Sequence, residues 1–186
     1  VLSATANLDP ETPLIICAKG VERGANLLMS EVMGDIVPQS PLAVLSGPTF
    51  AAEVARRLPT AVTLAARDTE LAERLAIMIG SPIFRPYVSD DPIGAEICGA
   101  VKNVLAIACG IIQGRQLGDN ARAAVITRGV AEIARLGAAK GAHHNTIIGL
   151  SGLGDLTLTC NAMQSRNFSL GVALGEGQSL NDILSS

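Results

Sequence analysis

Aromatic side chains are scarce in this 186-residue sequence: Phe, Tyr and Trp together make up 2% of it, and Trp does not occur. The platforms on which single-stranded nucleic acids stack need such rings. Positive charge is also in short supply, because 14 Lys and Arg stand against 17 Asp and Glu and leave a net charge of -3. A nucleic-acid surface needs a basic face. The composition therefore argues against nucleic acid as a partner.

The residues from which metal sites and disulfides are built are few as well. The sequence contains four cysteines (Cys17, Cys98, Cys109 and Cys160) with no Cys-x-x-Cys pair, and its two histidines, His143 and His144, stand together in a polar turn. This usage is typical of small buried thiols in a reducing compartment and of surface histidines. No metal site is predicted.

Long apolar runs and targeting segments are also missing. The longest apolar run, residues 104–112, is too short to span a bilayer, and no signal peptide is recognisable. We therefore expect a soluble cytoplasmic protein without a membrane span. The sequence begins at Val1 rather than Met and ends in what resembles a helix under way. These ends suggest a fragment of a longer protein.

Strand-length segments alternate with helical patterns in the first half of the sequence. Residues 13–18 (PLIICA) form a continuous apolar run, and residues 42–45, 60–66 and 84–88 are further strand candidates. Continuous apolarity is typical of strands that are covered on both faces. Residues 26–32, 50–57 and 68–79 have helical patterns, with Thr49 as a plausible N-cap of the second. The alternation predicts a parallel or mixed sheet of the doubly wound type.

No strand is predicted after Asp91. Residues 93–113 and 121–136 form two long helical stretches, and Asp119 and Asn120 before the second are good helix-start residues. Helical patterns follow at residues 153–159, 166–175 and 180–184. The sequence therefore predicts an α/β domain over residues 1–90, followed by an all-α domain over residues 91–186.

One lysine, Lys102, stands beside Asn103 in the apolar, small-residue stretch GAVKNVLAIACG. A buried lysine loses hydration, so its pKa falls towards the range that is useful for proton transfer. A helix whose lysine extends along its own stem to reach water would show the same pattern. The stretch alone leaves both interpretations open.

Two polar segments follow predicted strands. Lys19 comes directly after the first strand, and Gly47 and Thr49 come after the second, before a helix. Ligands of doubly wound sheets bind beyond the carboxyl ends of the strands, and a helix N-terminus favours an anion. A solvated loop charge and an ordinary strand-to-helix turn are the structural alternatives.

A third polar segment lies near the end of the sequence, where Ser165, Arg166 and Asn167 follow Asp155. The arginine fork can hold a phosphate, and Ser and Asn can add hydrogen bonds. Asp155 could hold a lysine or a substrate hydroxyl. A helix cap and a surface arginine would explain the same residues without a ligand.

With these residues identified, four motifs in order resemble the NAD(P)-dependent glycerol-3-phosphate dehydrogenases of bacterial type: LSGPTFAAEVARRLPTAV, EICGAVKNVLAIACGI, GDNARAAVITRG and LSGLGDLTLTC followed by SRN. The resemblance covers nearly the whole chain. It implies a Rossmann-like domain joined to a helical substrate domain. It also implies hydride transfer between dihydroxyacetone phosphate and sn-glycerol 3-phosphate, with NAD or NADP as cofactor. The product would supply phospholipid synthesis, and the implied assembly is a homodimer.

The resemblance also implies a role for each candidate residue. Lys102 resembles the general acid/base lysine, and Lys19 resembles the second lysine of the site, in contact with substrate and cofactor. The remaining implied contacts are Gly47, Thr49, Asp155, Ser165 and Asn167 for the substrate, Ala51 for the cofactor, and Arg166 as a phosphate clamp that also touches the cofactor.

The chain departs from the family at both ends. No Gly-x-Gly-x-x-Gly follows a predicted strand, and the segment at Gly152 and Gly154 has only two of the three glycines. The sheet would therefore be the second half of a Rossmann-like domain, and we expect the isolated piece to be inactive. Two alternatives stay open: another reductase of the β-hydroxyacid dehydrogenase type, and a non-catalytic helical dimerisation fragment. The sequence does not decide between NAD and NADP.

Overall fold

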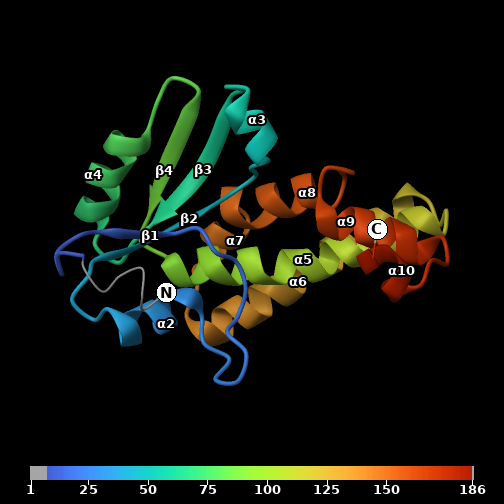
Figure 1. Ribbon diagram of the computed structural model, residues 1–186, viewed down its shortest axis with the longest axis horizontal. Coiled ribbons are helices and arrows are strands. Elements are labelled where there is room, and N and C mark those ends of the chain that lie inside the picture. Colours follow the sequence, from blue (N-terminus) through green and yellow to red (C-terminus); the bar gives the residue numbers. More distant parts are fainter. Residues whose placement is uncertain (1–7, 186) are drawn as a thin grey trace.

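The computed structural model describes residues 8–185 and shows a four-stranded sheet followed by helices (Figure 1). In chain order the first elements are β1 (Leu14–Ile16), α2 (Met29–Ile36), β2 (Leu42–Ser46), α3 (Ala51–Ala55), β3 (Thr60–Ala65), α4 (Thr69–Ile79) and β4 (Phe84–Ser89). The later ones are α5 (Pro92–Gly114), α6 (Asp119–Lys140), α7 (His144–Ile147), the π-helix η1 (Leu150–Gly154), α8 (Asp155–Thr159), α9 (Arg166–Gly175) and α10 (Leu180–Ser185). The predicted order of an α/β part and a helical part is confirmed.

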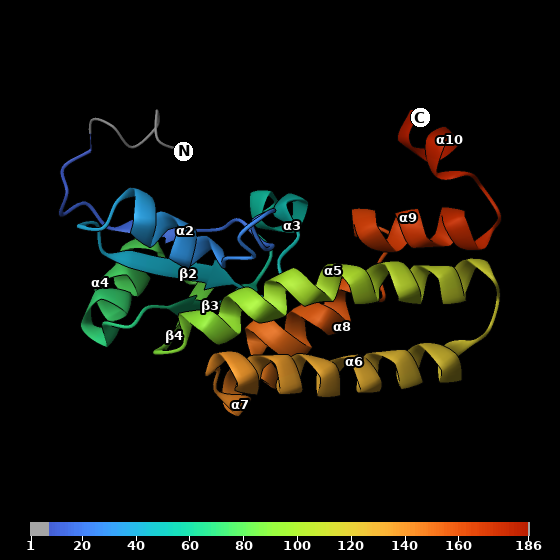
Figure 2. The ribbon, with the colours of Figure 1, turned by 90° about the horizontal axis from the view of Figure 1, so that it is seen from below.

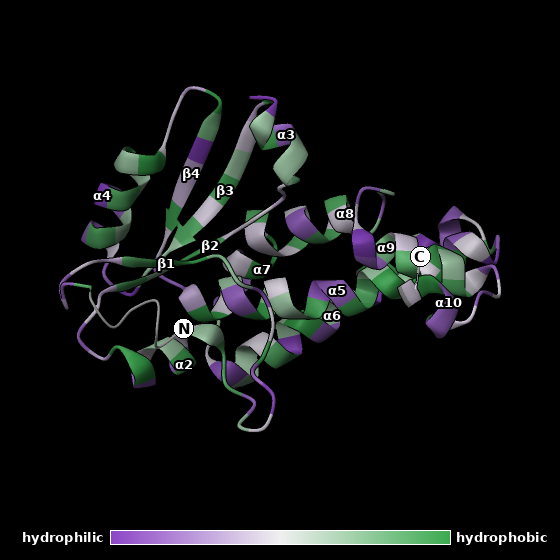
Figure 3. Ribbon diagram, in the orientation of Figure 1, coloured by the Kyte–Doolittle hydropathy of each residue, from purple (hydrophilic) through white to green (hydrophobic). Residues whose placement is uncertain are grey.

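The sheet has the strand order β1-β2-β3-β4 and is mixed. β1 runs parallel to β2, and β3 runs parallel to β4, while β2 and β3 are antiparallel. Ala43, Leu64 and Leu71 pack together on the α4 side, whereas Val44 and Ala65 pack towards α2 and α5 on the other side. Figure 3 shows the strands mostly in white and green, as expected for covered strands, although the edge strand β4 contains no buried residue. The doubly wound prediction is therefore confirmed.

Two local predictions at helix starts are wrong. α2 begins at Met29 rather than at residue 26, because Asn26 takes a left-handed turn with φ of 57°. Thr49 does not cap α3, because the helix begins at Ala51 with Phe50 in the capping position. By contrast, Asp68 does cap α4: its carboxylate accepts hydrogen bonds from two backbone N–H groups of the first turn, at 3.0 and 3.3 Å.

Asp91 links the sheet to the helices. Its carboxylate accepts a hydrogen bond of 2.8 Å from the backbone N–H of Gly94 and so caps the first turn of α5. The other carboxylate oxygen accepts one of 2.8 Å from the backbone N–H of His143, just before α7. One buried side chain therefore fixes both the start of α5 and the path of the chain into α7.

The central helix of the second half is α5, which runs between α6 and α9 (Figure 2). By length and hydropathy α5 could cross a membrane, although no purely apolar run in the sequence is long enough. Half of its most apolar 18-residue window is buried inside this fold, as in the core helix of a soluble protein. Ile97, Ala106 and Cys109 of α5 form a core with Ile133 of α6 and Phe168 of α9.

Glycines form the contact between α5 and α9. A Cβ atom on Gly110 would lie 2.1 Å from the carbonyl oxygen of Phe168, and one on Gly171 would lie 2.2 Å from that of Ile107. Gly114 and Gly175, one turn further along each helix, meet in the same way. The two backbones therefore approach each other as closely as only small residues allow. This contact places the first turn of α9 against the middle of α5.

We predict that Gly171→Ala destabilises the protein, because the added methyl group would overlap the α5 backbone. Overpacking of this kind costs about 1–3 kcal/mol. The measurement is urea-induced unfolding of the natural polypeptide that carries this sequence. Gly34→Ala in α2 is the matched control, since a Cβ atom there meets nothing within 4 Å. Equal stability of the two variants would contradict the close contact.

Candidate active site

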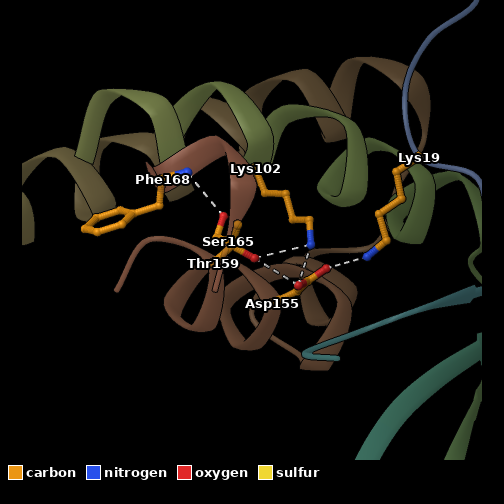
Figure 4. A network of polar contacts seen from close by, with 6 residues as sticks. All are labelled: Lys19, Lys102, Asp155, Thr159, Ser165 and Phe168. Atoms are coloured by element: carbon orange, nitrogen blue, oxygen red, sulfur yellow. Dashed lines mark hydrogen bonds and ion pairs between the residues drawn. The ribbon is translucent and has the colours of Figure 1, made fainter. Parts of the chain in front are cut away.

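Lys102 and Asp155 form a buried ion pair (Figure 4). Lys102 lies in the middle of α5, and its Nζ donates a hydrogen bond of 2.5 Å to Oδ1 of Asp155, the first residue of α8. Only 11% of the Lys102 side chain and 1% of the Asp155 side chain is exposed. Of the two interpretations left open by the sequence, burial of the lysine is the one the structure shows.

Lys19 reaches the same carboxylate from the other side. It lies in the loop after β1, and its Nζ donates to Oδ2 of Asp155 at 2.6 Å. Its side chain is 27% exposed, so this pair stands closer to solvent than the first. One buried carboxylate thus joins the loop after β1, helix α5 and helix α8.

Thr159 completes the network. Its hydroxyl accepts a hydrogen bond of 3.3 Å from Nζ of Lys102 and donates one of 3.2 Å to Oδ1 of Asp155. Sequence reasoning did not single this residue out as a site residue. The signal was available, because residues four apart on a helix share a face and Thr159 follows Asp155 by four.

Burial lowers the pKa of Lys102 to about 8, because its charged form loses hydration. The positive charge of Lys19 lowers it further, whereas the carboxylate of Asp155 raises it. The groups around Lys102 therefore shift its pKa in opposite directions. The outcome is an amine that can give up or accept a proton close to neutral pH.

A cavity of about 480 Å³ opens beside Lys102, and we refer to it as the Lys102 cavity. Its walls come from the start of α3, the middle of α5, the end of α8 and the start of α9; the residues are Thr49, Phe50, Ala51, Ala52, Lys102, Asn103, Thr159, Gln164, Ser165, Arg166 and Asn167. Six residues that were predicted from distant motifs thus line one cavity. Asn103 and Gln164 are polar wall residues that the prediction did not include.

Within this cavity Ser165 has a structural role of its own. Its hydroxyl accepts a hydrogen bond of 3.3 Å from the backbone N–H of Phe168 and caps α9. Arg166 follows as the first residue of α9 and is exposed. The cap therefore fixes the point at which Arg166 and Asn167 enter the cavity wall.

A second cavity, of about 610 Å³, adjoins the first and shares Thr49 and Ala51 with it. We refer to it as the Lys19 cavity. It lies at the carboxyl ends of β1 and β2, and its walls are mainly apolar, with Leu45, Val54, Val62 and Phe84 among them. Lys19 and Gly47 also line it. Eight of the nine predicted site residues line one or both of these cavities. The ninth, Asp155, pairs with Lys19 of one cavity and Lys102 of the other, so all nine lie within one region.

Gly47 is required by the backbone at this point. Its φ is 150°, and a Cβ atom there would lie 3.0 Å from Cα of Val62 on the neighbouring strand. A glycine is therefore needed for the chain to leave β2 beside β3.

A larger cavity of about 700 Å³ between β4 and α7 contains none of the predicted site residues.

Comparison with known proteins places the chain in one family. Residues 91–186 match the family described as NAD-dependent glycerol-3-phosphate dehydrogenase C-terminus, and residues 1–72 match the corresponding N-terminus. The glycerol-3-phosphate dehydrogenase [NAD(P)+] of Rhodospirillum rubrum is 62% identical over 185 residues, which are 99% of this chain and 53% of that protein. That of Parvibaculum lavamentivorans is 62% identical over 172 residues, which are 92% and 52%.

A solved structure supports the same family match. The crystal structure of glycerol-3-phosphate dehydrogenase from Coxiella burnetii superposes with a TM-score of 0.94 at 45% identity, covering 99% of this chain and 56% of that one. The chain spans about half the length of the curated relatives it matches. Both halves of the sequence match this family, and so does the fold; the chain belongs to the NAD-dependent glycerol-3-phosphate dehydrogenases.

Proposed function

We propose that the protein carrying this chain interconverts dihydroxyacetone phosphate and sn-glycerol 3-phosphate, with NAD or NADP as the hydride carrier. The observation that carries the proposal is the buried Lys102, with a pKa of about 8, in the wall of a cavity that also presents Arg166. The names of the relatives give the same reaction class.

Lys102 handles the proton of the reacting oxygen. In the reduction direction its Nζ gives a proton to the ketone oxygen, and in the oxidation direction the neutral amine takes the proton of the hydroxyl. The hydrogen bond to Asp155 directs Nζ of Lys102, while Thr159 holds the same ammonium from a second side. Lys19 adds a second positive charge near the oxygen on which negative charge develops.

Arg166 holds the phosphate of the substrate. Its guanidinium can bind two phosphate oxygens at once, and the N-terminus of α9 adds the favourable end of a helix dipole. Ser165 and Asn167 flank it on the cavity wall, and Thr49 faces the same space. The backbone at Gly47 carries no side chain to block the approach of a ligand.

The residues of the Lys19 cavity fit the nicotinamide end of the cofactor. The cavity is mostly apolar, and the Ser46 hydroxyl in its wall is buried without a hydrogen-bond partner among residues 8–185. Lys19 and Ala51 would border the cofactor there, and Arg166 would touch it from the adjoining Lys102 cavity. When bound, the cofactor supplies or accepts the hydride; the chain's own residues orient the substrate and move the proton.

Several wider features belong to the same proposal. The cofactor-binding part would extend to residue 90 and the substrate part would begin at residue 91, as supported by Asp91 at the start of α5. The protein would act in the cytoplasm as a homodimer, without a membrane span, and would supply glycerol 3-phosphate for phospholipid synthesis.

We predict opposite pH dependences for the two directions of the reaction. Oxidation needs neutral Lys102, so kcat/KM should rise with pH up to about 8 and then level off. Reduction needs protonated Lys102 and should fall above about 8. Lys102→Met should lower both rates by about 10²–10⁴-fold. The measurement is the pH profile of the natural polypeptide, with Lys140→Met at the exposed end of α6 as control. An unchanged profile in Lys102→Met would refute the assignment.

We predict that Arg166→Ala raises KM for dihydroxyacetone phosphate by about 10–150-fold, the loss of 1.5–3 kcal/mol in charge-assisted hydrogen bonds. Its effect on unphosphorylated dihydroxyacetone should be small. Steady-state kinetics with both substrates measures this, and Arg128→Ala on the exposed face of α6 is the control. If Arg166→Ala changed KM equally for dihydroxyacetone phosphate and for unphosphorylated dihydroxyacetone, the result would instead favour a β-hydroxyacid dehydrogenase activity.

We predict that Asp155→Asn lowers the free energy of unfolding at pH 7 by about 3–5 kcal/mol, because two lysines then lose their buried partner. The loss should shrink as pH rises above 8, since Lys102 is then neutral in the unmodified protein as well. Urea titrations at two pH values test this. Asp119→Asn breaks an exposed ion pair and should cost below about 1 kcal/mol. A loss that is independent of pH would contradict the pairing of Lys102 with Asp155.

A further inference from the structure

The place of Lys19 in the site depends on a residue with no side chain. Gly99 is buried on α5, one turn before Lys102. A Cβ atom there would lie 3.3 Å from both Cγ and Cδ of Lys19 and 3.6 Å from the Ser46 hydroxyl oxygen. The stem of Lys19 therefore lies directly against the backbone of α5.

Lys19 must follow this path to reach its partner. It starts in the loop after β1, and its ammonium ends 2.6 Å from Asp155, the first residue of α8. Figure 4 shows Lys19 and Lys102 approaching Asp155 from two sides. Contacts at Cγ and Cδ stand halfway along the stem, so a shift there moves the ammonium as well.

We propose that Gly99 is a positioning residue: the space left by its missing side chain holds the stem of Lys19 along α5 and so keeps the second ammonium on Asp155, beside Lys102. The use of this arrangement in proton transfer rests on the proposed function. The arrangement itself rests on the contacts of Gly99.

The proposal predicts a change in Lys102. The charged groups that face Lys102 are Lys19 from the loop after β1, Asp155 from α8 and Arg166 across the cavity at the start of α9; the thiol of Cys160 follows α8. Lys19 lowers the pKa of Lys102, and Asp155 raises it. If the ammonium of Lys19 moves away, Asp155 acts on Lys102 alone and the pKa of Lys102 rises.

A merely structural glycine would behave differently. Glycine inside a helix is unfavourable relative to alanine, so Gly99→Ala would then stabilise the protein and leave Lys102 unchanged. The positioning role predicts altered titration of Lys102 without this gain in thermal stability, because displacement of Lys19 weakens its ion pair with Asp155. These two outcomes separate the roles without an assay of activity.

The experiment compares Gly99→Ala and Gly99→Val in the natural polypeptide. Tracer acetylation over a range of pH, read for Lys102 by peptide mass spectrometry, follows the fraction of neutral amine. We expect acetylation of Lys102 at pH 7.5 to fall about threefold in Gly99→Val, the effect of a rise of half a pH unit in its pKa, and less in Gly99→Ala. In the oxidation direction kcat/KM near neutral pH should fall in parallel, while Gly34→Ala changes neither.

Lys19→Met provides the decisive background. In the Lys19→Met background, Gly99→Ala should no longer affect the titration of Lys102, because the side chain displaced at position 19 then carries no charge. An unaltered titration in both single variants, or an equal shift in the Lys19→Met background, would overturn the proposal. Absence of turnover of dihydroxyacetone phosphate by the unmodified protein would refute the proposed function instead, and the titration would still test Gly99.

Discussion

A single buried carboxylate connects the parts of this site. Asp155 binds Lys102 at 2.5 Å and Lys19 at 2.6 Å, and it is 1% exposed. Burying one anion with two cations is tolerable only because every pair is in direct contact, since an unpaired charge in the interior is costly. The loop after β1, the middle of α5 and the start of α8 must therefore meet at one point. The relative position of sheet and helices follows from that requirement.

A second constraint, purely steric, brings Ser165, Arg166 and Asn167 to the same place. The glycines of α5 and α9 let the two backbones touch, so the first turn of α9 lies against α5 near Lys102. The Ser165 cap then determines where α9 begins, and with it the point from which the Arg166 side chain extends. The spacing between the backbones of Arg166 and Lys102 is thus determined by contacts between the two helices rather than by flexible side chains.

Local patterns in the sequence were enough to predict the order of strands and helices, but they left the burial of Lys102 open. Continuous apolar runs indicated covered strands, whereas a lysine among small apolar residues fitted both a buried charge and one that reaches water along its own stem. The antiparallel pairing of β2 with β3 could not be predicted, because strand direction depends on the path of α3 between them. The bridging of two lysines by Asp155 and the contact of Gly99 with Lys19 join residues far apart in sequence, which no local pattern encodes. The roles of the individual residues in catalysis stay predictions.

The opposing effects on the pKa of Lys102 would let this one residue serve both directions of the proposed reaction. Burial and Lys19 disfavour its charge, and Asp155 favours it, so its pKa settles at about 8 rather than far above or below neutrality. An ordinary lysine would hold its proton too firmly to act as a base, and a lysine buried without Asp155 would be too seldom protonated to act as an acid. In the proposed reaction, the two ammoniums and one carboxylate would also leave one positive charge beside the reacting oxygen, which would lower the energy of an oxygen that carries negative charge. Electrostatic balance, more than any single contact, would then suit this site to moving a proton in either direction.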